Sequence, residues 1–252
     1  NMAKVIAPFK IVGTLDDLNF YIDENNTNRV RTKGKTGVSS EEFKSNPVFE
    51  KARKHSSEFG KAVKKAESFR GIAHYFYNKA KDGSFAGRAN KLLLEIIKED
   101  TLNPEGERTF ENGMLHPETK TYFLNFEGNK LRPLNEVLKA NWHWDENEAT
   151  LRFEQLIPSK HIDWPETAEQ AHLAIALANW NYLENTFTTE YSEEIILKKD
   201  DTTVENGILK TKTPKDNQLH ILFLYIGFSK NNRGKSIDLK RSYNTVTIIW
   251  TK

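Results

Sequence analysis

The chain has 252 residues, of which 37% are hydrophobic and 29% charged, and its net charge is +2. Its length and its aromatic content allow a buried core and exclude an intrinsically disordered chain. The absence of cysteine excludes disulfide bonds, a thiol nucleophile and cysteine-ligated zinc. No apolar run reaches the roughly 20 residues of a membrane span. Pro8 and Lys10 interrupt the first apolar stretch, so we expect no signal peptide and a cytoplasmic protein, with signal-independent export left open.

We expect residues 1–35 to form a small β-meander. β-prone runs at 9–12, 18–22 and 29–33 are separated by turn-forming polar residues, which is the pattern of hairpins. In the third run the basic residues alternate with others, so Arg29, Arg31 and Lys33 are expected on one face of a strand.

A helical region is expected to follow, up to residue 107. Asn46 and Pro47 are a good helix start, as N-cap and first helical residue. Apolar residues then recur with the helical period, and basic residues fall mostly on the other side. The apolar set is Phe49, Ala52, Phe59, Ala62, Val63, Ala66 and Phe69, and the basic set is Lys51, Arg53, Lys54, Lys61, Lys64 and Lys65. Another helix is expected over residues 89–98, and Asn103-Pro104 closes the region.

The pattern after residue 108 is that of an antiparallel β-sandwich, immunoglobulin-like or similar. Alternation predicts strands at 121–126 and 244–250 and a hairpin over 140–153, while the run 219–228 is apolar on both faces, as in a central strand. Residues 168–182 are rich in alanine and compatible with a helix. A strand is favoured there, because larger apolar residues alternate with the alanines.

The predicted fold class is therefore α+β, with an N-terminal β-hairpin and helices followed by the sandwich. The predicted domains are a basic β-hairpin and helical region, residues 1–107, and a β-sandwich domain, residues 108–252.

Two stretches carry a resemblance to a known family. The first contains Gly13-Thr14, Leu18, Phe20-Tyr21, Val30-Arg31 and Lys33-Gly34, and the second contains Asn46-Pro47-Val48-Phe49, Arg53, Ser57-Glu58-Phe59-Gly60 and Lys64. They are similar to motifs of a family of proteins of comparable length, widespread in Bacteroidota, for which no activity is established. The chain departs from that family at Lys35, where the family has glycine, and at His55-Ser56, where it has Asn-Gly. The resemblance implies the architecture, including a strand at 168–182, and no mechanism.

Motifs of catalysis and metal binding are not recognisable. The segment 229–236 lacks the first glycine of a phosphate-binding loop and leads towards a strand, so we expect a basic hairpin. His143 and Asp145 share a predicted strand face, but no paired-histidine motif accompanies them. A Gly-x-Ser-x-Gly segment is absent, and the seven histidines are scattered. We expect no catalytic residue, cofactor or metal ion, and a protein that is not an enzyme.

Uneven charge gives the strongest functional indication. Residues 1–100 hold 19 Lys and Arg against 13 Asp and Glu, a balance of +6, and the remainder has a balance of −4. The basic half suggests a surface for nucleic acid or a protein partner, against the ordinary alternative of a solvated helix face. The candidate residues are Arg29, Arg31, Lys33, Lys35, Lys54, Lys61 and Lys65.

The five tryptophans suggest a second kind of site. Trp142, Trp144 and Trp250 are expected to face inward from strands, as core residues. Trp164, beside Pro165 in a loop, is the one expected to be exposed and is a candidate for glycan contact.

The favoured interpretation is a non-enzymatic structural or interaction protein that acts through its surfaces, with itself or another protein as partner. The opposite charges of the two halves would pair head to tail between copies, which assembles rings or filaments, or within one chain, which leaves a monomer. The alternatives are a nucleic-acid-associated protein that uses the basic half and a glycan-binding β-sandwich.

Overall fold

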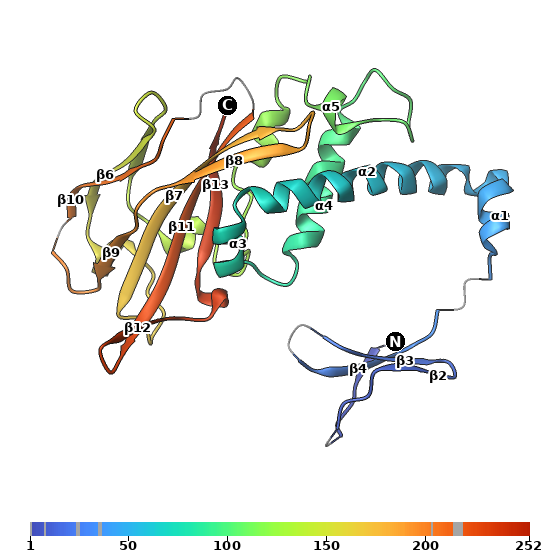
Figure 1. Cartoon of the computed structure of the whole chain (residues 1–252), viewed down its shortest axis with the longest axis horizontal. Coiled ribbons are helices and arrows are strands. Elements are labelled where there is room, and N and C mark those ends of the chain that lie inside the picture. The colour runs from blue at the N-terminus through green and yellow to red at the C-terminus, as the bar shows by residue number, and fades with distance from the viewer. Residues whose placement is uncertain (1, 8, 24–25, 35–36, 203, 214–218) are drawn as a thin grey trace. The chain divides into compact units, whose positions relative to one another are not determined.

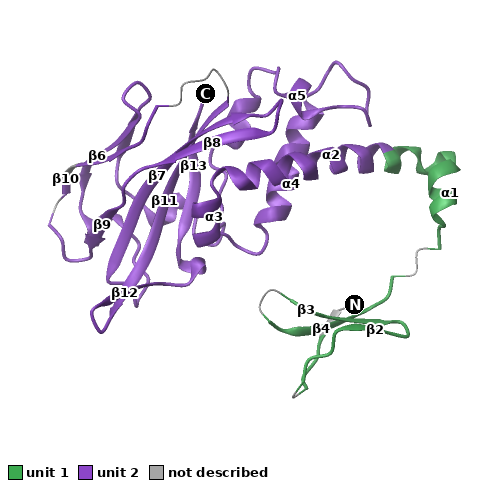
Figure 2. Ribbon diagram, viewed as in Figure 1, with its two compact units in different colours: residues 1–53 green, residues 54–252 purple. Residues whose placement is uncertain are grey.

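The chain divides into two compact units, residues 1–53 and 54–252 (Figure 2). The computed structural model describes residues 2–7, 9–23, 26–34, 37–202, 204–213 and 219–252. The boundary between the units lies well before the predicted boundary at residue 107. The helices that follow residue 53 share one hydrophobic core with the C-terminal strands, which places both in the same unit.

The first unit contains a four-stranded antiparallel sheet in the order β1-β4-β3-β2. Its strands are β1 (Met2–Lys4), β2 (Gly13–Leu15), β3 (Leu18–Ile22) and β4 (Asn28–Thr32). The run 9–12, expected to be extended into a hairpin, lies outside the strands, and β2 starts at Gly13. Helix α1 (Ser40–Ser45) and the 3-10 helix η1 (Pro47–Phe49) follow. Asn46 caps η1 by accepting a hydrogen bond from the Val48 amide, in agreement with its predicted capping role.

Most helices of the second unit lie in its first half. The helices are α2 (Glu50–Ile72, which begins in the first unit), α3 (His74–Lys79), α4 (Phe85–Lys98), α5 (Phe110–Gly113), α6 (Leu134–Val137), α7 (Pro158–His161) and the 3-10 helices η2 (Thr119–Phe123) and η3 (Arg241–Tyr243). The two long predicted helices are confirmed. Among the described helices, none has both the length and the apolar character that a membrane crossing needs.

The strand predicted at 121–126 is wrong, because η2 and a loop occupy these residues. Phe123 and Phe126, three positions apart, both pack against Phe69, with ring centroids 5.6 and 5.3 Å away. The apolar residues therefore follow the period of a 3-10 turn, which a short segment does not distinguish from strand alternation.

Two antiparallel sheets complete the second unit. The large sheet contains β7 (Gln170–Asn181), β8 (Thr186–Tyr191), β9 (Ile195–Lys198), β11 (Leu219–Asn232), β12 (Lys235–Asp238) and β13 (Thr245–Thr251). The small sheet contains β5 (Trp142–Asp145), β6 (Thr150–Leu156) and β10 (Val204–Lys210). In the large sheet β11 pairs with β7, β12 and β13, and β7 also pairs with β8 and β9. Residues 168–182 thus form a strand, as the alternation favours.

The large sheet is the middle of three layers, with α2, α3 and α4 on one face and the small sheet on the other (Figure 1). Leu173, Ile175 and Leu177 of β7 contribute to the inter-sheet core, defined as the apolar cluster between the two sheets. Ala174 and Ala176 contribute to the helix-side core, defined as the apolar cluster under the helices. Because both faces of β7 and β11 are covered along their middle parts, residues 173–178 and 221–228 are apolar. The fold is α+β with a sandwich-like C-terminal part.

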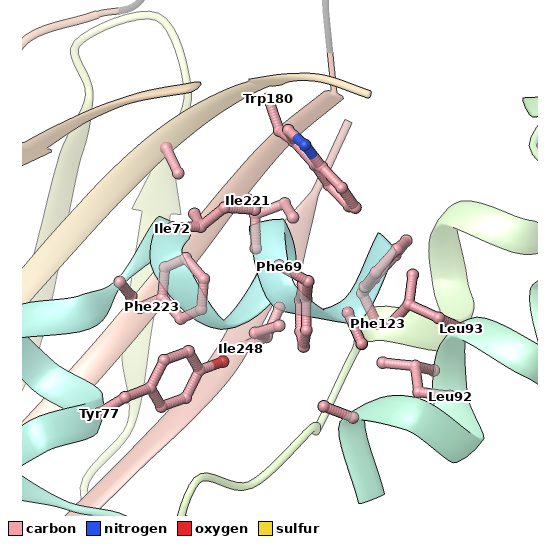
Figure 3. Packing of buried hydrophobic residues seen from close by; sticks show 14 of the residues in the cluster. Phe69, Ile72, Tyr77, Leu92, Leu93, Phe123, Trp180, Ile221, Phe223 and Ile248 are labelled. Atoms are coloured by element: carbon pink, nitrogen blue, oxygen red, sulfur yellow. The ribbon is translucent and has the colours of Figure 1, made fainter. Parts of the chain in front are cut away.

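Aromatic rings dominate the helix-side core (Figure 3). Phe69 of α2 lies 6.1 Å from Trp180 of β7, centroid to centroid, and Phe76 stacks on Tyr225 of β11 at 4.9 Å. The small alanine side chains on this face of β7 leave room for these rings. Rings packed in this way contribute about 0.5–1.5 kcal/mol per pair beyond the area they bury.

Candidate functional site

Two residues of the predicted basic surface, Lys61 and Lys65, are bound to their own chain. The Lys61 ammonium donates to the carbonyl oxygens of Glu107 at 2.7 Å and Arg108 at 2.9 Å. The Lys65 side chain is 9% exposed and donates to the Tyr182 carbonyl at 2.7 Å, besides an ion pair with Glu111. The expectation that Lys65 lies on the solvated side of its helix is wrong. It stands one turn before Phe69, and so on the buried side of α2.

Glu58, one turn before buried Ala62, is also fully buried on this side of α2. Its carboxylate accepts two hydrogen bonds from the Arg108 guanidinium, at 2.7 and 2.9 Å, and one from the Gly106 amide at 2.7 Å. Burial raises the pKa of Glu58, but the hydrogen bonds from Arg108 and Gly106 outweigh it and lower the pKa below its usual value. Lys54 lies here too, with its aliphatic stem against Gly106.

Asp100, just after α4, binds the same loop as Glu58, the segment that follows α4 and contains Gly106 and Arg108. Its buried carboxylate accepts hydrogen bonds from the amides of Leu102, Asn103 and Thr109 and from the Asn103 side chain, at 2.8 to 3.1 Å. Burial raises the pKa of Asp100, yet these hydrogen bonds lower it to about 2. We call Glu58, Lys61, Lys65, Asp100 and Arg108 the loop anchor. The charged groups of the loop anchor bind residues 100–111 and stabilise this loop, so their role is structural.

Replacing Asp100 by asparagine is expected to lower the free energy of unfolding by about 2 kcal/mol at pH 7, since its pKa is lower in the folded chain than in the unfolded chain. This stabilisation is complete above about pH 5 and is lost as the pH falls from about 4 to 2, so the difference between variant and wild type shrinks over that range. Urea unfolding followed by tryptophan fluorescence at several pH values measures it, with exposed Asp200→Asn as control. A difference that does not change with pH would contradict the assignment.

The other basic candidates lie on the sheet of the first unit, except Lys35, which is outside the described residues. Arg29 and Arg31 project from the same face of β4, as alternation predicts, and Lys33 follows the strand. Arg29 forms an ion pair with Asp23 at 2.9 Å, and the Arg31 guanidinium lies 5.8 Å from the centre of the Tyr21 ring. These residues belong to the first unit, and Lys54, Lys61 and Lys65 of α2 belong to the second.

The opposite face of this sheet is apolar. By strand register, Leu15 pairs with Leu18, and Phe20 pairs with Val30. Together with Ile22 these five residues form what we call the apolar sheet face. Leu15 is 66% exposed, and Leu18 and Ile22 are about two-fifths exposed. Neither hydrophobic core includes a residue of the first unit. Phe20 and Val30 are half-buried, and Asn28, on the same face, forms two hydrogen bonds with the Ile11 backbone. The apolar sheet face is thus only partly covered, with Leu15, Leu18 and Ile22 exposed.

Trp164, the candidate for glycan contact, is half-buried at the edge of the inter-sheet core. Its indole Nε1 donates to the Pro158 carbonyl at 2.8 Å, and its ring lies edge-on to Phe228 with centroids 5.8 Å apart. These contacts give Trp164 a packing role. Trp142, Trp144 and Trp250 pack against the same core from their strands.

A group that the sequence does not reveal lies on the helix-side face of the large sheet. His172 of β7 has its Nδ1 3.0 Å from Glu194 Oε2 and its Nε2 2.8 Å from Ser229 Oγ of β11. Ser229 Oγ also accepts a hydrogen bond from Ser236 Oγ of β12, at 3.0 Å. When the Ser229 hydroxyl hydrogen points away from His172, it can be donated to Gln170 Oε1, 3.2 Å away. We call these five residues the His172 cluster.

The register between β7 and β11 creates the His172 cluster, because it pairs Gln170 with Ser229 and His172 with Gly227. The segment 229–236 forms the predicted hairpin, with β11 and β12 joined at Arg233 and Gly234. Both residues of this turn have positive φ, as a two-residue hairpin turn requires. The sequence indicates the hairpin, whereas the neighbour of Ser229 across the sheet depends on the pairing of strands far apart in the chain.

Comparisons of the chain with protein-family models, with curated proteins and with solved structures give no match. In the part of the chain that the structure describes, no three His, Asp or Glu side chains gather in a way that suits a metal ion. The function is therefore inferred from the geometry of the two units.

Proposed function

We propose that the protein is an interaction protein whose N-terminal unit associates with a second copy of itself through the apolar sheet face. The observation that carries this proposal is the exposure of Leu15, Leu18 and Ile22 on one side of a sheet whose other side carries Arg29 and Arg31. A small sheet gains stability when an apolar face is packed against another element. Contiguous exposed apolar surface of this kind is typical of a binding surface.

The distribution of charge favours a second copy as the partner. The described residues on the apolar face are uncharged, so an identical face meets no like charge there. In a face-to-face pair the arginines point outward on opposite sides. Stacked sheets lie about 10 Å apart, so the two basic faces are separated by more than the screening length of about 8 Å. Self-stacking therefore buries apolar surface without electrostatic repulsion.

The size of the face predicts a weak dimer. Two strands of five residues and two of three, spaced by about 4.8 Å and with about 3.3 Å per residue, cover about 250 Å² in projection. Stable interfaces bury about 800 Å² per partner. Residues of the first unit that lie outside the strands add apolar surface, since Phe9 is 65% and Val12 69% exposed. Association is accordingly expected to depend on protein concentration.

Light scattering coupled to size exclusion, over a wide concentration range, tests the proposal. The wild type is expected to shift from monomer towards dimer as its concentration rises, and Leu15→Asp to remain monomeric, because the new carboxylate would be buried without a partner. Thr14→Asp is the matched control. It introduces the same charge at the neighbouring position, whose side chain points to the opposite face.

Salt separates this proposal from head-to-tail pairing of oppositely charged units. Apolar stacking persists in high salt, whereas pairing of exposed charges weakens. A monomer at every concentration, an equal loss of dimer in both variants, or a dimer that dissolves in salt would each contradict the apolar face as the contact. The nucleic-acid alternative has less support, because Lys61 and Lys65 already bind their own chain.

A further inference from the structure

We propose that Ser229 is an activated nucleophile for acyl transfer from small esters, with His172 as its general base and Glu194 as the group that orients the histidine. This inference goes beyond the proposed function, because it concerns the second unit and holds whether or not the protein dimerises. It runs against the expectation, drawn from the sequence, that the protein is not an enzyme.

The hydrogen bonds of the His172 cluster fix the direction of proton transfer. A carboxylate only accepts, so Glu194 takes the hydrogen of His172 Nδ1 over 3.0 Å. The unprotonated Nε2 then accepts from the Ser229 hydroxyl at 2.8 Å. These distances are within the range that general-base activation of a serine requires. A serine, a histidine and an acidic residue hydrogen-bonded in this order form a catalytic triad, which is recognised by the roles of its residues and not by the fold.

A substrate would have to reach Ser229 from the side of β12. Ser229 is fully buried, but Ser236, whose hydroxyl lies 3.0 Å away, belongs to a strand whose four residues are all exposed. Gln170, whose side-chain oxygen accepts from the Ser236 hydroxyl, also lines an open pocket of about 680 Å³, together with Glu169, Lys198 and Asn231. Displacement of the β11–β12 hairpin would expose Ser229 on this side, which favours a small acyl group.

Hydrolysis of an ester by Ser229 needs water as its only co-reactant. Ser229 Oγ bonds to the ester carbonyl carbon as its proton moves to His172 Nε2, and the bond to the alcohol oxygen breaks as that proton passes to the leaving alcohol. Water then gives a proton to His172 and attacks the acyl-serine. The bond between the acyl carbon and Ser229 Oγ then breaks as His172 Nε2 returns the proton to Ser229 Oγ. This step releases the carboxylic acid and regenerates free Ser229 and neutral His172.

Reaction of the full chain with diisopropyl fluorophosphate tests the nucleophile directly, because this small reagent forms a covalent bond to activated serine oxygens and releases fluoride. We expect one adduct by intact mass, mapped to Ser229 by peptide mass spectrometry, and none after denaturation. His172→Gln is expected to slow labelling by at least about 100-fold, the usual minimum for loss of a general base. His143→Gln, at the exposed position of β5, is the matched control and should label at the wild-type rate.

Three outcomes would overturn the proposal. They are the absence of an adduct on folded wild type, an adduct on another serine such as Ser236, and equal labelling rates for His172→Gln and wild type. Tryptophan fluorescence during urea unfolding establishes that each variant is folded before it is labelled. Since wild-type labelling decides the first two outcomes, the test does not depend on whether a variant folds.

Discussion

Replacing Glu58 by alanine is expected to lower the free energy of unfolding of residues 54–252 by about 3–5 kcal/mol, the cost of breaking a buried ion pair from one side. The Glu58 carboxylate is fully buried and accepts three hydrogen bonds, two from Arg108 and one from the Gly106 amide. Removal of the carboxylate leaves the guanidinium without its counter-charge and the amide without an acceptor. All five tryptophans lie in this unit, so tryptophan fluorescence during urea unfolding reports on it alone.

Two further variants make this result specific. Glu67→Ala removes an exposed carboxylate from the same helix and is expected to change stability by less than about 0.5 kcal/mol. Glu58→Gln keeps an acceptor for the Gly106 amide while removing the charge, so its effect should lie between the other two. A loss below about 1 kcal/mol for Glu58→Ala would show that Arg108 finds another partner and that the loop anchor is not essential.

Gly113→Ala is expected to destabilise the same unit by several kcal/mol. The added methyl group would overpack the core, and it would do so against backbone atoms that cannot move aside as a side chain can. A Cβ at Gly113 would lie 2.0 Å from the carbonyl oxygen of Ile96, which belongs to α4 and cannot move without disturbing that helix. α5 therefore packs against α4 at a distance that only glycine permits. Urea unfolding followed by fluorescence measures the loss.

The matched control is Gly60→Ala, in the middle of α2. A Cβ there meets no atom beyond the neighbouring backbone of its own helix within 4 Å. Alanine therefore contributes only its higher helix propensity, and the substitution should stabilise the unit by about 0.5–1 kcal/mol. The two substitutions are chemically identical and are expected to have opposite signs. Equal effects at both positions would mean that α4 and α5 are not in close contact.

Local patterns in the sequence predicted most of the elements. The capping role of Asn46, the two long predicted helices and the two-faced apolar strand at 219–228 depend on neighbours a few residues away. The alternation of Arg29 and Arg31 likewise predicted their common face. Such patterns are reliable because side-chain direction follows directly from the backbone period.

Predictions failed where a polar residue found a distant partner. Lys65 and Glu58 resemble solvated residues in the sequence, yet the loop at 106–111 supplies Gly106, Arg108 and Glu111 to satisfy them in a buried position. No property of residues 58–65 indicates that this loop returns to them. Burial of charge is possible only where partners exist, and the fold decides that.

The apolar sheet face and the His172 cluster also separate what local sequence patterns determine from what depends on contacts between distant residues. The sequence by itself determined that Arg29 and Arg31 lie on the side of β4 opposite to Val30, since alternation is a property of each strand. Only the tertiary structure decided that the apolar sheet face lies outside both cores. It also decided that His172 and Ser229, 57 positions apart, meet at 2.8 Å, because strand pairing and register depend on packing over the whole unit.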